Sequence, residues 1–129
     1  MPDLIHQFIQ AGASRAPDAP ALHYKAQTCT YGQLNEDIAR VAGGLAALGL
    51  SAGERVAVYL PKLPETVQAI FGTAAAGGVF VPVNPLLKPQ QVSYILRDCN
   101  VRVLVTSAQR LESLVPLLED CHDLRAVVV

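Results

Sequence analysis

The sequence predicts an α/β fold, a parallel sheet with flanking helices, and three features indicate it. Strand-like apolar runs alternate with helix-like segments across connections of only a few residues. Residues 55–60 form an apolar run with little polar alternation, which is typical of a strand covered on both faces. Apolar residues make up 51% of the chain and charged residues 16%, which excludes disorder and indicates one domain with a filled core.

The N-terminal segment is expected to fold as a short helix followed by a hairpin. Asp3 can cap the helix and Gly12 can end it, and four apolar side chains would share one face: Leu4, Ile5, Phe8 and Ile9. Prolines punctuate residues 15–20, so we expect a loop there. Residues 21–25 and the stretch around Cys29 favour two short hairpin strands.

The clearest helix signal begins at Thr30. Thr30 and Gln33 have capping-box spacing, in which each side chain satisfies a backbone donor of the first turn. Five apolar residues follow at helical spacing and form a stripe that needs a surface to pack on: Leu34, Ile38, Val41, Leu45 and Leu48. Gly49 can adopt the left-handed conformation that ends such a helix.

Strands and helices alternate over the rest of the chain. After the strand at 55–60 we expect a helix at 65–76, whose small residues, Gly72 among them, let it lie close to the sheet. Further on we expect a strand at 79–83, a helix at 89–98 that Asn100 ends, a strand at 101–106, a helix that Ser107 caps, and a strand at 126–129. Pro116 lies inside the last helix, so a kink or two shorter pieces are expected.

Charge and cysteine content narrow the function classes. The net charge is −1 and no basic run occurs, which argues against nucleic acid as a partner. The three cysteines are scattered, without a CxxC pair, and are expected to be mostly buried, reduced thiols of a cytoplasmic protein. An acid near the start, Asp3, argues against a signal peptide. The apolar tract 66–83 contains Gln68 and Pro82, which favour a buried helix and strand over a membrane span.

No catalytic motif is present in the sequence. It has no GxxxxGK[ST] phosphate loop, no GxGxxG after a strand, no HExxH and no GxSxG. Three histidines have no patterned partner and are expected to be exposed or locally bonded: His6, His23 and His122. Four acids near helix ends are expected to be solvated: Asp98, Glu119, Asp120 and Asp123.

The sequence therefore indicates no candidate site. Cys121 and His122 stand side by side, but no second pair of ligands stands at a metal-site spacing. We predict no catalytic residue and no metal ligand in this chain, and we assign no cofactor-binding residue.

A well-specified α/β domain without a site leaves two explanations open. It is either a small binding module without catalysis or a part of a larger enzyme whose site lies further along. A receiver-type module needs an acidic cluster at its first strands, and residues 55–60 and 79–83 carry no acid. A flavodoxin-like module needs backbone N–H donors after its first strand, where this chain has Pro61, Lys62, Leu63 and Pro64. The larger enzyme is favoured.

Five segments together resemble the opening of the AMP-binding, adenylate-forming enzymes. They are Arg15-x-Pro17-Asp18-x-Pro20-Ala21-Leu22, Thr30-Tyr31-Gly32-Gln33-Leu34, Leu45-x-x-Leu48-Gly49-Leu50-x-x-Gly53-Glu54-Arg55-Val56-Ala57-Val58, Ala76-Gly77-Gly78-Val79-Phe80-Val81-Pro82-Val83-Asn84-Pro85 and Tyr94-Ile95-Leu96-Arg97-Asp98. Their order and spacing match throughout, so the resemblance covers nearly the whole chain.

The resemblance implies a two-step ligase. Such an enzyme first joins a carboxylic acid to ATP, releasing pyrophosphate, and then passes the acyl group to the thiol of coenzyme A (CoA). ATP, Mg²⁺ and CoA are the cofactors implied for the parent enzyme. The family's phosphate-binding loop, adenine-contacting stretch, ribose-binding aspartate, hinge and C-terminal lysine have no counterpart in this sequence.

Residues 1–129 are therefore expected to be an incomplete N-terminal domain of that enzyme. Alone, the chain is expected to be inactive and to bind none of these cofactors. The implied partners are the remainder of its own chain and, in the parent enzyme, a carboxylic acid substrate.

Two branches of the family remain open. Peptide-synthetase adenylation domains usually have an aspartate where this chain has Asn84, so Asn84 and Pro85 look more like acyl-CoA ligases. The run 83–88 is similar to acyl-CoA ligases associated with bacterial exosortase systems. Some ligases have an arginine, suited to a CoA phosphate, directly after the Asn-Pro pair. Leu86 departs from that pattern, and Lys88 is the substitute candidate.

The strand at 126–129 carries a further expectation. An open strand edge can pair with another chain, and an uncovered apolar sheet face favours association. We expect self-association through this strand or face, unless the helix around residues 111–118 covers the edge.

Overall fold

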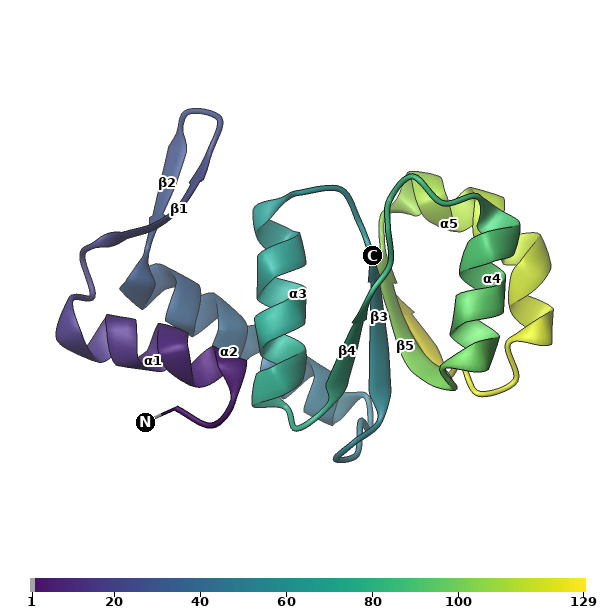
Figure 1. Ribbon diagram of the computed structural model, residues 1–129, viewed down its shortest axis with the longest axis horizontal. Helices are drawn as coiled ribbons and strands as arrows, with labels where there is room; N and C mark the ends of the chain where they lie inside the picture. The colour runs from purple at the N-terminus through teal and green to yellow at the C-terminus, as the bar shows by residue number, and fades with distance from the viewer. Residues whose placement is uncertain (1) are drawn as a thin grey trace.

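The computed structural model describes residues 2–129 and has a four-stranded parallel sheet at its centre (Figure 1). The strands are β3 (Arg55–Tyr59), β4 (Val79–Pro82), β5 (Val101–Thr106) and β6 (Ala126–Val128), in the spatial order β4–β3–β5–β6. Val56 of β3 lies opposite Phe80 of β4 and Val103 of β5. All three pairings are parallel, so the predicted α/β fold with a parallel sheet is confirmed.

Helices connect the strands and cover both faces of the sheet. In chain order they are α2 (Tyr31–Ala47), α3 (Pro64–Ala75), α4 (Pro89–Asp98), α5 (Ala108–Leu114) and the 3₁₀ helix η1 (Val115–Asp120). Val56 and Val58 pack with α2 and α3 on one face, whereas Ala57 and Tyr59 pack with α4, α5 and η1 on the other. Figure 1 shows α3 and α4 on opposite sides of the sheet. Burial on both faces explains why β3 lacks polar alternation.

An N-terminal unit precedes the sheet. It consists of α1 (Ile5–Arg15), an antiparallel hairpin of β1 (Pro20–Tyr24) and β2 (Gln27–Thr30), and α2. The predicted hairpin is confirmed, and so is the capping box of α2. Thr30 Oγ1 accepts from the Gln33 N–H at 3.2 Å, and Gln33 Oε1 accepts from the Thr30 N–H at 3.0 Å. Gly49, with φ +89°, follows the end of α2 as predicted.

Helix α1 differs from the prediction at both ends. Its N-cap residue is Leu4, and the Gln7 side chain, not that of Asp3, accepts from the first backbone donors. The helix continues past Gly12 to Arg15. Gly12 serves a close contact instead, because a Cβ at this position would lie 2.7 Å from Cδ1 of Tyr31.

The apolar stripes of α1 and α2 are also less buried than predicted. On α1, Leu4, Ile5 and Phe8 are exposed. On α2 the stripe is buried at three positions and half-buried at Val41, but Leu48 at its end is half exposed, at 50%. Periodicity alone identified the helices, but it did not show how much of each face another element covers.

Helices α2 and α3 pack closely through a glycine. A side chain at Gly72 would collide with Val41, whose Cβ lies 2.7 Å from the position of a Gly72 Cβ. The small residue therefore admits α2, and the prediction that it brings α3 close to the sheet was wrong. Pro116 divides the last helical segment into α5 and η1, as predicted. Asn100, with φ +51°, follows the end of α4.

An ion-pair network joins three strands at the amino end of the sheet. Arg102 of β5 contacts Glu54, just before β3, at 3.0 Å and Asp123, before β6, at 2.8 Å. Arg125 approaches Glu54 at 3.5 Å, and Asn100 donates to Asp123 at 2.8 Å. Asp123 is therefore a paired residue, and its prediction as a solvated charge was wrong.

Candidate functional site

The strand order creates a switch point at the carboxyl end of the sheet. The chain passes from β3 outward to β4 and then returns across β3 to β5, so the loops after β3 and β5 leave in opposite directions. Ligands of open α/β sheets bind in the crevice at such a point. In this protein Thr106 Oγ1 donates to the Tyr59 carbonyl at 2.8 Å across the switch point, and both residues are buried.

The loop after β4, residues Asn84 to Lys88, lies at the same end of the sheet. Asn84 Oδ1 accepts from the Leu86 N–H at 2.9 Å, and the Asn84 carbonyl accepts from the Leu87 N–H at 3.1 Å. The Lys88 N–H donates to Gln91 Oε1 at 2.9 Å as α4 begins. The side chain of Leu86 is 87% exposed. The loop is thus an ordered turn that presents an apolar side chain to solvent.

Two side chains outside this loop, Tyr59 at the end of β3 and Arg110 in α5, donate hydrogen bonds to its backbone. The Tyr59 hydroxyl donates to the Leu87 carbonyl at 2.8 Å, and Arg110 Nη1 donates to the Pro85 carbonyl at 2.8 Å. The Arg110 guanidinium stacks over the Tyr59 ring, 4.5 Å from its centroid. Tyr59 is buried, so its hydroxyl needs such a partner. Within residues 2–129 Arg110 forms no ion pair.

An apolar groove of about 710 Å³ opens at the switch point. We call it the switch-point groove, and α2, α3 and the carboxyl ends of β5 and β6 border it with the residues Val41, Gly44, Leu45, Leu48, Leu60, Leu63, Glu65, Gln68, Ala69, Val105, Thr106, Ser107, Ala108, Val128 and Val129. Among these described residues Glu65 alone carries a charge. The groove can accept apolar groups, and it offers no paired acid and base for catalysis.

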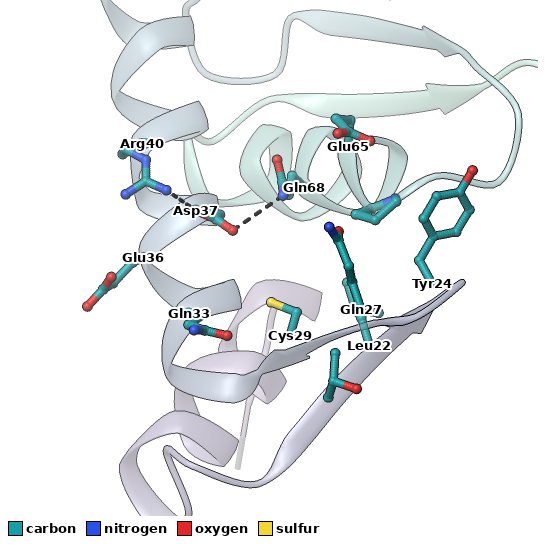
Figure 2. A pocket seen from close by; sticks show the side chains of 12 residues that line it. Leu22, Tyr24, Gln27, Cys29, Gln33, Glu36, Asp37, Arg40, Glu65 and Gln68 are labelled. Atoms are coloured by element: carbon teal, nitrogen blue, oxygen red, sulfur yellow. Dashed lines mark hydrogen bonds and ion pairs between the residues drawn. The ribbon is translucent and has the colours of Figure 1, made fainter.

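A polar hollow of about 430 Å³ lies between the hairpin, α2 and α3 (Figure 2). Asp37 at its wall pairs with Arg40 and accepts from Gln68 Nε2 at 3.3 Å. Burial raises the pKa of the nearby Cys29 thiol, and the negative charge of Asp37 adds to the rise. A protonated thiol is a poor nucleophile, so the hollow lacks an activated cysteine.

The remaining predicted residues lie apart from one another. His6 is buried, and its Nδ1 has no hydrogen-bond partner, so the prediction of an exposed or locally bonded side chain was wrong. His23 bonds locally, with Nδ1 3.0 Å from Thr28 Oγ1, and His122 is exposed. The three cysteines are free, although only Cys121 is buried.

No group of three or more His, Cys, Asp and Glu side chains within residues 2–129 is arranged to hold a metal ion. Over the same residues no helix is long and apolar enough to cross a membrane.

Sequence reasoning missed Tyr59 and Arg110. Tyr59 was interpreted as one more residue of an apolar strand, and Arg110 carried no motif. One signal was available for Tyr59: a tyrosine at the end of a buried strand brings a hydroxyl that must find a partner. Nothing in the sequence indicated Arg110.

Comparison with known proteins identifies relatives over nearly the whole chain. The family model described as AMP-binding enzyme matches residues 9–129. Tyrocidine synthase 3 of Brevibacillus parabrevis is 35% identical over 125 residues, which are 95% of this chain and 2% of that protein. The long-chain-fatty-acid–CoA ligase of Bacillus subtilis (strain 168) is 35% identical over 102 residues, 79% of this chain and 18% of the ligase.

Solved structures share the fold. The anthranilate CoA ligase AuaEII, in complex with anthranoyl-AMP, matches with a TM-score of 0.91 and 27% identity over 100% of this chain and 26% of that chain. This chain thus spans about a quarter of that structure and less of the two sequence relatives. A synthase and a ligase match at the same identity, so identity does not separate the two branches.

Proposed function

The chain belongs to the AMP-binding enzyme family, and on that premise we propose that it is the N-terminal portion of an AMP-forming acyl-CoA ligase. In the proposed reaction a carboxylic acid and ATP give an acyl-adenylate and pyrophosphate. The CoA thiol then displaces AMP and forms the acyl-CoA thioester. The family uses ATP with Mg²⁺, whereas CoA belongs to the ligase branch alone.

The choice of the ligase branch rests on the asparagine at position 84. Its side-chain oxygen closes the turn by accepting from the Leu86 N–H, and the side chain is exposed. An aspartate could accept the same bond, so the fold does not require Asn84 in place of the aspartate usual in peptide synthetases. The amide at this position supports the ligase branch for that reason. The run 83–88 supports, within that branch, ligases associated with exosortase systems.

We propose that the described residues supply a scaffold for this reaction and that other parts of the protein perform it. The carboxyl end of the sheet has neutral hydrogen bonds, one stacked arginine and an apolar groove. We propose that the phosphate-binding loop and the catalytic lysine belong to the remainder of the protein, which acts in the cytoplasm. Lys88, exposed on the β4–α4 loop, is the proposed contact to a CoA phosphate.

The peptide-synthetase alternative rests on a specific observation. Tyrocidine synthase 3 matches a larger share of this chain than the long-chain ligase does, 95% against 79%. If the chain belonged to that branch, the enzyme would activate an amino acid and pass it to a carrier-protein thiol.

One assay separates these functions. The protein encoded by the complete natural gene is tested for ATP–pyrophosphate exchange with fatty, aromatic and amino acids, and then for transfer to CoA or to a carrier protein. We expect exchange with a fatty or aromatic acid and a CoA thioester as product. Exchange with amino acids alone and transfer to a carrier protein would assign the chain to the peptide-synthetase branch.

Two simpler experiments test whether the 129-residue chain binds nucleotide and how the natural gene continues. Titration of the 129-residue chain with millimolar ATP or AMP should give no heat of binding, because no phosphate loop is present. In the natural gene, codons for a loop rich in Ser, Thr and Gly with a lysine should follow Val129. A stop codon at that point would support the small binding module instead.

A further inference from the structure

The β4–α4 loop is tied down at nearly every backbone polar group. The N–H groups of Leu86, Leu87 and Lys88 are all bonded, the first two to Asn84 and the third to Gln91. The Lys88 carbonyl accepts from the first full turn of α4. Backbone groups paired in this way resist local opening. The loop itself is therefore ordered, and the question is what fixes its place against the sheet.

One side chain from a strand and one from a helix supply that link. The Tyr59 hydroxyl and Arg110 Nη1 donate to the carbonyls of Leu87 and Pro85, each at 2.8 Å. These donors come from the end of β3 and from the first turn of α5, which follows β5. The loop after β4 is thereby bonded to the end of the adjacent strand β3 and to the helix that follows β5.

The stack of Arg110 on Tyr59 makes the two links a single unit. The guanidinium lies 4.5 Å from the ring centroid, and Tyr59 is only 4% exposed, so the ring cannot turn without displacing its neighbours. A planar guanidinium can stack and donate in its own plane at once, which a lysine cannot do. Because no acid among the described residues pairs with Arg110, its orientation depends on the ring and the Pro85 carbonyl.

We propose that Tyr59 and Arg110 are positioning residues that fix the β4–α4 loop against the end of β3 and the start of α5, and so determine where Leu86 and Lys88 project. The structural part stands on the contacts alone. Its consequence for catalysis rests on the proposed function, in which Lys88 contacts a phosphate of CoA, the thiol substrate that accepts the acyl group.

Amide hydrogen exchange in the 129-residue chain tests the structural part. Tyr59→Phe removes the hydroxyl donor and keeps the ring, and Arg110→Met keeps the contact with the ring and removes the donor to Pro85. Each should accelerate exchange at Leu86 and Leu87 about tenfold, the factor expected from losing one hydrogen bond. Exchange in the centre of β5, at Leu104, should stay as in the unmodified chain.

Matched controls use a tyrosine and an arginine without a role in the loop. Tyr94 is 61% exposed on α4, and Arg97 donates to the Ser93 carbonyl within its own helix at 3.3 Å. Tyr94→Phe and Arg97→Met should leave the loop amides unchanged. Unchanged loop exchange in both test variants would overturn the proposal. Equal acceleration at Leu104 would also overturn it, because the pair would then stabilise the whole sheet.

Kinetics of the complete enzyme test the consequence separately. Arg110→Met should lower the efficiency of thioester formation several-fold more than that of pyrophosphate exchange. Equal effects on both steps would remove the link between the loop and the acceptor thiol. If the unmodified enzyme shows no pyrophosphate exchange, the proposed function fails, whereas the exchange data on the loop still decide the structural part.

Discussion

At the amino end of the sheet ion pairs join three strands, whereas at the carboxyl end hydrogen bonds to backbone carbonyls and one arginine–tyrosine stack hold the loops. Arg102 reaches Glu54 and Asp123 at the first end. Tyr59 and Arg110 reach the β4–α4 loop at the second. The charges at the amino end find partners within the domain, and the apolar groove lies at the other end. The comparison indicates that the amino end is satisfied by contacts within the domain, whereas the carboxyl end leaves apolar surface available to another part of the protein or to another chain.

The largest expected effect is self-association of the chain through the carboxyl end of the sheet, at β6 and the switch-point groove. Val129 lines the switch-point groove, is 70% exposed and directly follows the edge strand β6. The opposite edge strand, β4, ends in Pro82, which lacks a backbone donor. Light scattering should show an apparent mass that rises with concentration, at least to that of a dimer. Val129→Lys should suppress the rise because a charge opposes strand pairing.

The matched control places the same charge on the other edge. Val79→Lys, at a 47% exposed position of β4, should leave the association unchanged. A monomer at every concentration, with exchange at Val127 as slow as in the core, would contradict this prediction. It would mean that η1 and its neighbours cover the edge.

Truncation of a side chain at the amino end of β3 should cost more stability than truncation of a larger side chain just after its carboxyl end. Val56 is fully buried near the amino end, so Val56→Ala leaves a closed cavity and should cost about 3 kcal/mol of unfolding free energy. Leu60 loses more atoms in Leu60→Ala, but it borders the open groove and should cost only about 1.5 kcal/mol. Urea denaturation measures both. A larger loss for Leu60→Ala would show that the groove is closed in solution.

A smaller effect is expected from removing helix caps. Thr30 lies away from the switch-point groove, and Ser107 lies at its rim. Thr30→Ala breaks a reciprocal capping box and should cost about 1 kcal/mol. Ser107 at the groove rim accepts a single longer bond from the Arg110 N–H, at 3.3 Å, and Ser107→Ala should cost about 0.5 kcal/mol. An unchanged urea midpoint for Thr30→Ala would show that this residue does not cap α2 in solution.

The smallest expected effect is the pH dependence of the amino-end network. The Ser51 N–H lowers the pKa of Glu54 below its ordinary 4.5, and Asn100 lowers that of Asp123 below 3.8. Groups whose pKa is lowered on folding stabilise the protein above their ordinary pKa, and this stabilisation is lost as the pH falls through the lowered values. Stability should therefore decrease on acidification below about pH 4.5, and the loss should be modest because the pairs border solvent.

Variants at the two ends check this assignment. Glu54→Gln and Asp123→Asn should flatten the acid part of the stability profile measured by urea denaturation. Tyr59→Phe, at the carboxyl end, should leave the shape of that profile unchanged, since no carboxylate takes part in its contacts. If the variant that combines Glu54→Gln with Asp123→Asn loses stability at acid pH as steeply as the unmodified chain, other carboxylates cause the pH dependence.

The sequence predicted the central elements well because local signals mark their boundaries. Helix α4 and strand β5 have the predicted bounds, with Pro89 at the start of the helix and Asn100 between the two elements. The capping box of α2 and the division at Pro116 also depend on neighbouring residues only. Such features are written within a few positions of one another, so a single sequence suffices to find them.

The errors arose where residues distant in the sequence meet. Gly12 was taken as a helix end, but the ring of Tyr31 requires a glycine there. Gly72 was assigned to the sheet, although Val41 is the residue that needs the space. The contact of Arg110 with Pro85 spans 25 positions and exists only because β4 and β5 flank the same strand. A pattern along the chain predicts which elements form, but their three-dimensional arrangement decides these contacts.

The amino-end network also has a consequence for folding on the ribosome. Synthesis proceeds from the N-terminus, so Glu54 is made first, then Arg102, and Asp123 and Arg125 come last. During translation Arg102 can pair with Glu54, but its second carboxylate and the cation that completes the network arrive with β6. In a nascent chain that ends before Asp123, Arg102 would lack one of its two carboxylate partners. Closure of this network therefore marks the moment at which the fourth strand joins the sheet.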